Sequence, residues 1–169
     1  MKLFNIIRMD LSTNRDSGFL CKCIFISYRI GRHTKNKIVR KFISIFHCFL
    51  SMLSNCSIPY SCQIGERVLF KHGFRGVFLS SGCIVGDECI ILHNVTIGSK
   101  YLDKKSSPNI SEKVLIGAGA VIVGDINIGK NSKIAPNSFV DFDVDNNTLI
   151  IPVVNKIVKM DNNESKYQQ

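Results

Sequence analysis

The sequence predicts an all-β fold, a parallel β-helix of six-residue repeats, preceded by a short α-helical segment. Two observations carry this prediction. From residue 57 onward aliphatic residues recur at every sixth position, whereas before it apolar residues recur at spacings of three and four. The chain has 169 residues, of which 45% are hydrophobic, and its mean hydropathy is +0.12, which excludes a wholly disordered protein.

Residues 1–56 are predicted to be helical and basic. They hold ten lysines and arginines against two aspartates, a net charge of +8, which leaves +1 for the rest of the chain. Between residues 35 and 53 the apolar side chains share one helix face, which either packs on a neighbouring element, as we expect, or lies on an anionic membrane. No nucleic-acid partner is expected. This face consists of Ile38, Val39, Phe42, Ile45, Phe46, Phe49, Leu50 and Leu53.

The cellular location is predicted from what the chain lacks. No stretch reaches the roughly 18 apolar residues of a membrane-spanning helix. Charged residues such as Arg8 and Asp10 interrupt the first twenty positions, where a signal peptide needs an apolar core. We therefore expect a cytoplasmic protein, with peripheral contact to the inner face of the membrane through residues 1–56 as an open alternative. Seven cysteines without paired Cys-x-x-Cys motifs favour neither a zinc ribbon nor a disulfide framework.

The repeat places two kinds of residue inside the coils. The aliphatic residue of each hexad is expected to point inward, because stacked short strands must bury one face. A small or β-branched residue two positions earlier fills the remaining space, which accounts for three cysteines. The aliphatic positions are Leu79, Val85, Ile91, Ile97, Ile116, Ile122, Ile128, Ile134 and Val140, and the small positions are Cys62, Cys83, Cys89, Val95, Ala120, Ser132 and Ser138.

Two interruptions of the six-residue spacing predict departures from a smooth coil. Residues 64 and 85 are 21 positions apart, three more than a multiple of six, so the stretch 71–76 is expected to be irregular. Residues 97 and 116 are 19 positions apart, and the polar stretch 99–111 is expected to loop out. Functional residues concentrate where a rigid scaffold positions irregular segments, so we expect the chemistry at these two places.

The repeat carries a series of short motifs, namely Ile64-Gly65, Lys71-His72-Gly73, Gly76-Val77, Val85-Gly86, Val95-Thr96-Ile97-Gly98, Gly117-Ala118-Gly119-Ala120 and Ile128-Gly129. This series resembles the serine acetyltransferase branch of the left-handed β-helix acyltransferases, over about residues 57–158. The resemblance implies a left-handed coil, acetyl-CoA as acetyl donor, a homotrimer and reaction clefts between adjacent subunits. We therefore expect a basic helical segment at 1–56, an acyltransferase domain at 57–158 and a flexible tail at 159–169.

By this resemblance His72 is the catalytic residue. As a general base it takes the proton from an acceptor hydroxyl that attacks the thioester, and it returns the proton to the leaving thiolate. An unperturbed imidazole pKa of about 6.5 suits that task. His93, Lys71 and Arg75 are the candidate substrate-binding residues, and His93 either binds the acceptor, shares the proton transfer or is simply exposed. By composition alone His72 would be read as a polar loop residue.

The same resemblance implies that acetyl-CoA is bound by the later coils. The small residues Gly117, Ala118, Gly119 and Ala120 let the pantetheine arm approach the backbone, and Lys133 either faces the nucleotide phosphates or is an ordinary solvated corner. No metal is expected. A zinc site of the γ-carbonic anhydrase kind needs three histidines, whereas two of the four histidines lie in the repeat.

Three positions depart from serine-specific members of that family. Those members carry Asp before the catalytic histidine, an orienting Asp in the preceding coil and Arg-His-Pro in the loop, where this chain has Lys71, Ser57 and Ser106-Ser107-Pro108. A zwitterionic amino acid needs an anion near its ammonium and a cation near its carboxylate, so we expect a hydroxyl of a cell-surface saccharide as acceptor. Serine O-acetylation and a non-catalytic β-helix scaffold or peripheral membrane protein remain alternatives. Candidates to orient His72 are Ser57, a backbone carbonyl, Glu66, Asp87 and Glu88.

Overall fold

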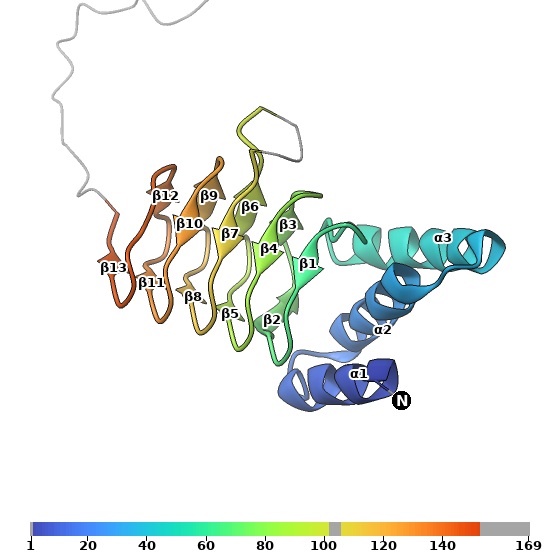
Figure 1. Ribbon diagram of the computed structural model, residues 1–169. Coiled ribbons are helices and arrows are strands. Elements are labelled where there is room, and N and C mark those ends of the chain that lie inside the picture. Colours follow the sequence, from blue (N-terminus) through green and yellow to red (C-terminus); the bar gives the residue numbers. More distant parts are fainter. Residues whose placement is uncertain (1, 102–105, 153–169) are drawn as a thin grey trace, which may run out of the picture.

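The structure is a computed structural model that describes residues 2–101 and 106–152. Three helices lie at one end of a stack of short strands (Figure 1). The helices are α1 (Lys2–Thr13), α2 (Phe19–His33) and α3 (Lys37–Leu53). The strands are β1 (Gln63–Ile64), β2 (Leu69–Phe74), β3 (Phe78–Leu79), β4 (Ile84–Val85), β5 (Ile90–Ile91), β6 (Thr96–Gly98), β7 (Asn109–Ile110), β8 (Leu115–Ile116), β9 (Val121–Val123), β10 (Asn127–Ile128), β11 (Lys133–Ile134), β12 (Phe139–Val140) and β13 (Leu149–Ile150).

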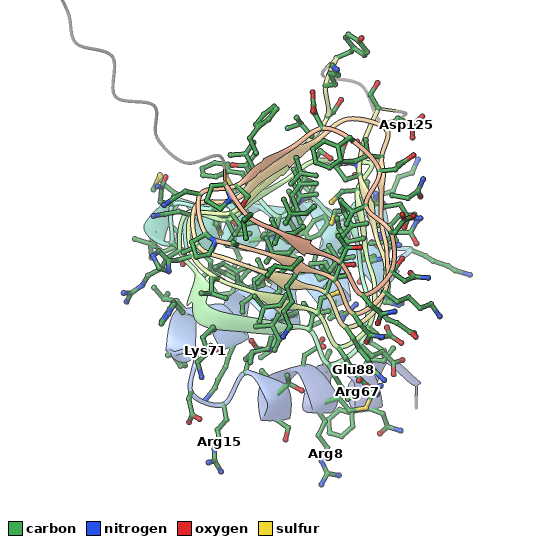
Figure 2. All side chains as sticks on the ribbon, turned by 90° about the vertical axis from the view of Figure 1, so that its left-hand side faces the viewer. Arg8, Arg15, Arg67, Lys71, Glu88 and Asp125 are labelled. Carbon is green, nitrogen blue, oxygen red and sulfur yellow. The ribbon has the colours of Figure 1, made fainter. Side chains whose placement is uncertain are left out.

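The strands form three parallel sheets, one for each side of the stack. Their orders are β1-β4-β7-β10, β13-β11-β8-β5-β2 and β12-β9-β6-β3, so the strands from β1 to β12 visit the sheets in turn. Figure 2 looks along the stack and shows side chains filling the space that the three sheets enclose. The predicted fold class, a β-helix with a short helical segment before it, is confirmed.

The six-residue period creates the core. Every aliphatic position predicted to point inward is at most 3% exposed, and every small position is at most 2% exposed. Parallel pairing aligns these residues in ladders, for example Ile91 with Ile116 and Ile116 with Ile134. Each fully buried isoleucine stabilises the fold by about 1.5 to 3 kcal/mol. A single short strand has too little apolar surface for this, so stability comes from stacking the coils.

The first interruption is a longer first coil. Phe70 pairs with Ile91, 21 positions later, whereas Leu79 pairs with Ile97, 18 positions later. The three extra residues fall between these pairs, in the second half of β2 and the turn after it. The stretch 71–76 is therefore irregular, as predicted.

The second interruption is shorter than predicted. Residues 109 and 110 are not in a loop, because β7 pairs with β4 and β10, and Ile110 is 1% exposed. Ile110 precedes Ile116 by six positions and so belongs to the inward ladder. The irregular stretch therefore lies between Ile97 and Ile110, because Ile110 already fills an inward position of the coil.

Helix α2 covers the open end of the first coil and satisfies its backbone. The Tyr28 hydroxyl donates to the Cys62 carbonyl over 2.7 Å, and the Arg29 guanidinium donates to the carbonyls of Ile64 and Gly65 over 2.7 and 2.6 Å. Arg29 is also paired with the buried Asp10 of α1, with 2.7 Å between Nε and Oδ2. Without the helices, these carbonyl groups of the first coil would have no hydrogen-bond partner inside the protein. The helices therefore act as a cap on the β-helix.

Helix α3 is oriented differently from our expectation. It packs on α2 through the side that carries the buried residues His47, Leu50 and Ser51. The predicted apolar face is exposed, since apart from Leu50 its residues are 45% to 70% exposed. The expectation that this face packs on a neighbouring element is thus wrong within the chain. His47 explains how a polar side packs instead, because both ring nitrogens are hydrogen-bonded, to the Ser27 hydroxyl and to the Ile58 carbonyl.

The limits of the predicted domains are only partly visible. The described helices end at Leu53 and the first inter-coil bridge is at Ser57. The predicted domain end at residue 158 and the tail 159–169 lie outside the described residues. Among the helices of the described part of the chain, none combines the length and the hydropathy needed to cross a bilayer.

Candidate active site

His72 and His93 lie next to each other on consecutive coils. Their ring centroids are 5.1 Å apart and the ring planes meet at 74°. His72 is exposed and His93 is half-buried. Among the described residues, Nδ1 of His93 is buried and has no hydrogen-bond partner. A buried ring nitrogen without a partner is costly, so this pair is well suited to a ligand that brings a polar group.

The first interruption is what exposes His72. Gly73 follows it with a φ of 70°, in the left-handed region that favours glycine, and turns the chain after the histidine. A Cβ at this position would lie 2.9 Å from the Ser17 carbonyl oxygen of the α1–α2 connection. The Ser17 hydroxyl in turn donates to the Phe70 carbonyl over 2.7 Å. The helical segment therefore holds the backbone on both sides of His72.

A pocket of about 570 Å³ opens beside His72. Its wall combines three parts of the chain: residues 17–21 around the start of α2, residues 53–55 at the end of α3, and residues 72–76 with Asn94 from the coils. Sequence reasoning gave the helical segment no part in the site and did not single out Asn94. No pattern in the sequence indicates the contact of residues 17–21 and 53–55 with the coils, because it depends on how the helices dock.

The predicted substrate-binding residues are not equally placed. Arg75 is exposed and lines the pocket together with His72, and its carbonyl accepts a 2.9 Å hydrogen bond from the Asn94 N–H. Lys71 is exposed but is not part of the pocket wall. Figure 2 shows its side chain pointing outward from one corner of the coils. The structure thus brings Arg75 to His72 and leaves Lys71 outside.

The proposed orienting groups for His72 lie elsewhere in the chain. Ser57 lines a separate groove that runs along β3 and β6. Glu88 pairs with Arg67 at a different corner, with 2.7 Å between Oε1 and Nη2 (Figure 2). Asp87 accepts a 2.7 Å hydrogen bond from the Glu66 N–H at that same corner. Within the described residues no carboxylate pairs with His72, and its ring neighbour is His93.

Residues Gly117 to Ala120 form a turn between β8 and β9, at the same corner of the coils as His93. The N–H groups of Gly117, Gly119 and Ala120 already donate to the carbonyls of Ile134, His93 and Gly117. A Cβ at Gly117 would lie 2.5 Å from the Pro136 nitrogen, so this glycine is needed for coil stacking. Ala120 is fully buried and its side chain belongs to the core. If acetyl-CoA binds at this corner, it must therefore form hydrogen bonds with groups other than these three backbone N–H groups.

Lys133 lies beside that corner. It is exposed on β11, where it pairs with Leu115 of β8 and Leu149 of β13 on a flat side of the β-helix. Its side chain is free to reach an anion outside the sheet, but it is not one of the residues that line the pocket of His72. Within the described ranges no cluster of three His, Cys, Asp or Glu side chains suited to a metal ion is found.

Comparison with known proteins agrees with this fold. A family model described as bacterial transferase hexapeptide (six repeats) matches residues 107–141. A serine acetyltransferase of Mycobacterium tuberculosis is 33% identical over 111 residues, which is 65% of this chain and 48% of that protein. One from Staphylococcus aureus is 36% identical over 100 residues, covering 59% of this chain and 46% of its own length. The chain spans about half the length of the curated relatives it matches.

Solved structures point the same way. The crystal structure of serine acetyltransferase isoform 3 from Entamoeba histolytica, in complex with cysteine, superposes with a TM-score of 0.78 at 20% identity and covers 95% of this chain and 62% of its own. The chain is serine acetyltransferase-like in sequence and in fold. The serine acetyltransferase of Neisseria gonorrhoeae in complex with serine has a TM-score of 0.72 at 26% identity and covers 90% of this chain and 67% of its own. The predicted resemblance is confirmed at this level. For this serine acetyltransferase-like chain, the roles of single residues stay predictions.

Proposed function

We propose that this chain carries an acetyl-CoA-dependent O-acetyltransferase activity with His72 as general base. The observation that carries the proposal is the exposed imidazole of His72 in a pocket wall, 5.1 Å from the ring of His93. The likeness to serine acetyltransferases supports acetyl transfer as the reaction class. The homotrimer and the cytoplasmic location expected from the sequence belong to this proposal.

The reaction follows from the two imidazoles. One nitrogen of His72 takes the proton of the acceptor hydroxyl while the oxygen attacks the thioester carbonyl of acetyl-CoA. The carbon–sulfur bond then breaks, the acetyl group stays on the acceptor oxygen, and the thiolate receives the proton from His72. His93 packs against the His72 ring with 74° between the ring planes, and this contact restricts how the ring of the base can turn. Arg75 supplies a cation in the same pocket.

Serine is the acceptor that the comparisons favour. Several relatives and structural neighbours are serine acetyltransferases, and one structure contains serine. Arg75 is the guanidinium that the serine carboxylate needs, since arginine binds carboxylates through paired N–H groups. This choice replaces the saccharide acceptor that the sequence favoured, which nothing in the comparisons supports.

A saccharide hydroxyl is the second candidate, because of the charge of the pocket. The described residues of the pocket wall include Arg75 and His72 but neither Asp nor Glu. The ammonium group of serine has therefore no anion to pair with inside one chain, whereas a neutral or anionic sugar needs none.

The test is a thiol-release assay with acetyl-CoA, run against L-serine and against a panel of hexoses and sialic acid. Serine-dependent thiol release supports the first acceptor, and sugar-dependent release without serine turnover supports the second. His72→Ala should reduce kcat by about 100-fold to 10,000-fold, the usual contribution of a general base. His33→Ala is the matched control, because His33 lies outside the pocket of His72 and is hydrogen-bonded to the Arg29 carbonyl of its own helix. Full activity in His72→Ala, or no turnover of any acceptor by the wild type, overturns the proposal.

A further inference from the structure

We propose that helix α3 binds the surface of an anionic phospholipid bilayer through an exposed apolar stripe. This inference is independent of the acetyl-transfer proposal. The stripe, called the α3 stripe below, consists of Ile38, Phe42, Ile45, Phe49, Met52 and Leu53.

The α3 stripe is one continuous face of a 17-residue helix. Its members follow each other at spacings of one, three and four, so they lie within one third of the helix circumference and extend over about 22 Å. They are between 52% and 71% exposed. The opposite side of α3 is the one that packs on α2 through His47, Leu50 and Ser51. Contiguous apolar surface of this kind is uncommon in soluble proteins and indicates an interaction site.

The charges beside the stripe select the partner. Lys37 and Lys41 are exposed next to the stripe at the start of α3, whereas Arg40 lies on the side of His47, and α3 contains no Asp or Glu. The two aspartates of residues 1–56 are already paired: Asp10 is buried against Arg29, and Asp16 lies 3.6 Å from the neighbouring Arg15. A second copy of this surface would offer these cations no unpaired anion. An anionic surface complements it.

A bilayer meets both requirements at once. Its interface takes up apolar side chains to a depth of about 5 to 10 Å, and anionic lipid headgroups attract each nearby lysine or arginine. Nucleic acid would satisfy the cations but leave the stripe in water. The helix would lie in the interface rather than cross it, in agreement with the finding that no described helix can span a bilayer.

The α3 stripe leads to the candidate active site. Leu53, its last member, also lines the pocket of His72. Phe19 and Leu20 of α2 line the same pocket and are 78% and 38% exposed. A protein bound through the stripe would therefore hold that pocket close to the membrane surface.

The experiment is co-sedimentation of the full chain with sucrose-loaded vesicles. Vesicles of phosphatidylcholine with 30% phosphatidylglycerol, an amount of about one anionic lipid in three, are compared with pure phosphatidylcholine, at low salt and in 0.5 M NaCl, about three times physiological ionic strength. We expect binding to the anionic vesicles that weakens by about tenfold in high salt or without the anionic lipid. Phe42→Ser/Phe49→Ser should weaken binding by at least about tenfold, because two aromatic rings no longer leave water. Lys37→Gln/Lys41→Gln should weaken it by about tenfold as well.

Matched controls separate the stripe from general effects. Phe142→Ser removes another half-exposed aromatic side chain from the last coils, and Lys113→Gln/Lys130→Gln removes two exposed cations of the β-helix. Both should bind as the wild type does, and circular dichroism should show that all variants are folded. The proposal is overturned if the wild type ignores anionic vesicles, or if Phe42→Ser/Phe49→Ser binds them unchanged. A third outcome also overturns it. In that outcome the wild type does not bind vesicles, and light scattering shows that Phe42→Ser/Phe49→Ser forms a smaller oligomer than the wild type, because a second copy of the chain covers the stripe.

Discussion

The side-chain amide of Asn14 forms the hydrogen bonds with the backbone around Phe70 that a neighbouring strand would otherwise form. Its Oδ1 accepts a 2.8 Å hydrogen bond from the Phe70 N–H, and its Nδ2 donates to the Val68 carbonyl over 2.8 Å. Asn14 is fully buried at the end of α1. The first coil has no preceding coil to pair with on this side, so one amide blocks an edge that would otherwise be open.

Asn14→Leu should lower the free energy of unfolding by about 2 to 4 kcal/mol, because it leaves the N–H of Phe70 and the carbonyl of Val68 buried without partners. Urea unfolding followed by circular dichroism measures this change. Asn5→Leu, on an exposed position of the same helix, is the matched control and should change stability by less than about 0.5 kcal/mol. Equal stability of Asn14→Leu and the wild type would show that the helical segment does not cap the coils.

His47 should make stability depend on pH. Burial lowers its pKa below the ordinary value, although its hydrogen bond to the Ile58 carbonyl opposes this. The folded state therefore prefers the neutral ring, and the unfolded chain binds more protons between the folded pKa and about 6.5. The stabilising contribution is fully present above about pH 6.5 and is lost as the pH falls through that window to the folded pKa.

Urea midpoints at a series of pH values from 7.5 to 5 measure this effect, a range that brackets the ordinary histidine pKa of about 6.5. His47→Gln keeps a polar side chain and removes the titration, so its midpoint should fall less over the same range than that of the wild type. Parallel curves for the two proteins would contradict the prediction.

The cysteines should differ sharply in reactivity. Cys48 is exposed, whereas burial raises the pKa of Cys21 to about 12 and the pKa values of Cys56 and Cys89 to about 11. Because the thiolate is the reactive form, the native protein should show a fast phase with Ellman's reagent that Cys48→Ser removes. Cys89→Ser should keep that phase. Cys23 is partly exposed, so a fast phase that survives in Cys23→Ser/Cys48→Ser would mean that a buried thiol is open to solvent.

His93 should act on catalysis through His72. If the proposed acetyl transfer is correct, His93→Gln should lower kcat by about tenfold to 100-fold, the range typical of losing a group that orients a catalytic one. The KM for acetyl-CoA should stay unchanged, because His93 acts on the base and not on the donor. His33→Gln is the matched control. An unchanged kcat in His93→Gln would restrict His93 to a structural role.

The adjacency of His72 and His93 was within reach of the sequence. The two residues are 21 positions apart, the same separation as Ile64 and Val85, which pair across the first two coils. Residues that precede the three extra positions of the first coil keep this separation of 21, which implies that residue 72 stacks on residue 93. The interruption of the repeat predicts the place of His72, and the same count of positions places His93 beside it, although the prediction for His93 did not include this contact.

By itself, the sequence determined the β-helix, its inward ladder and the position of the irregular coil. These features are local, since a six-residue period decides for each side chain whether it faces the core. Only the tertiary structure decided which side of α3 packs on α2, that Arg75 rather than Lys71 lines the pocket, and that Ser17 and Leu53 share that pocket with His72. The physical reason is that the period of a helix defines its apolar and polar faces but not the element on which each face packs. Which face of α3 packs on α2 depends on hydrogen bonds such as those of His47, which join segments distant in sequence.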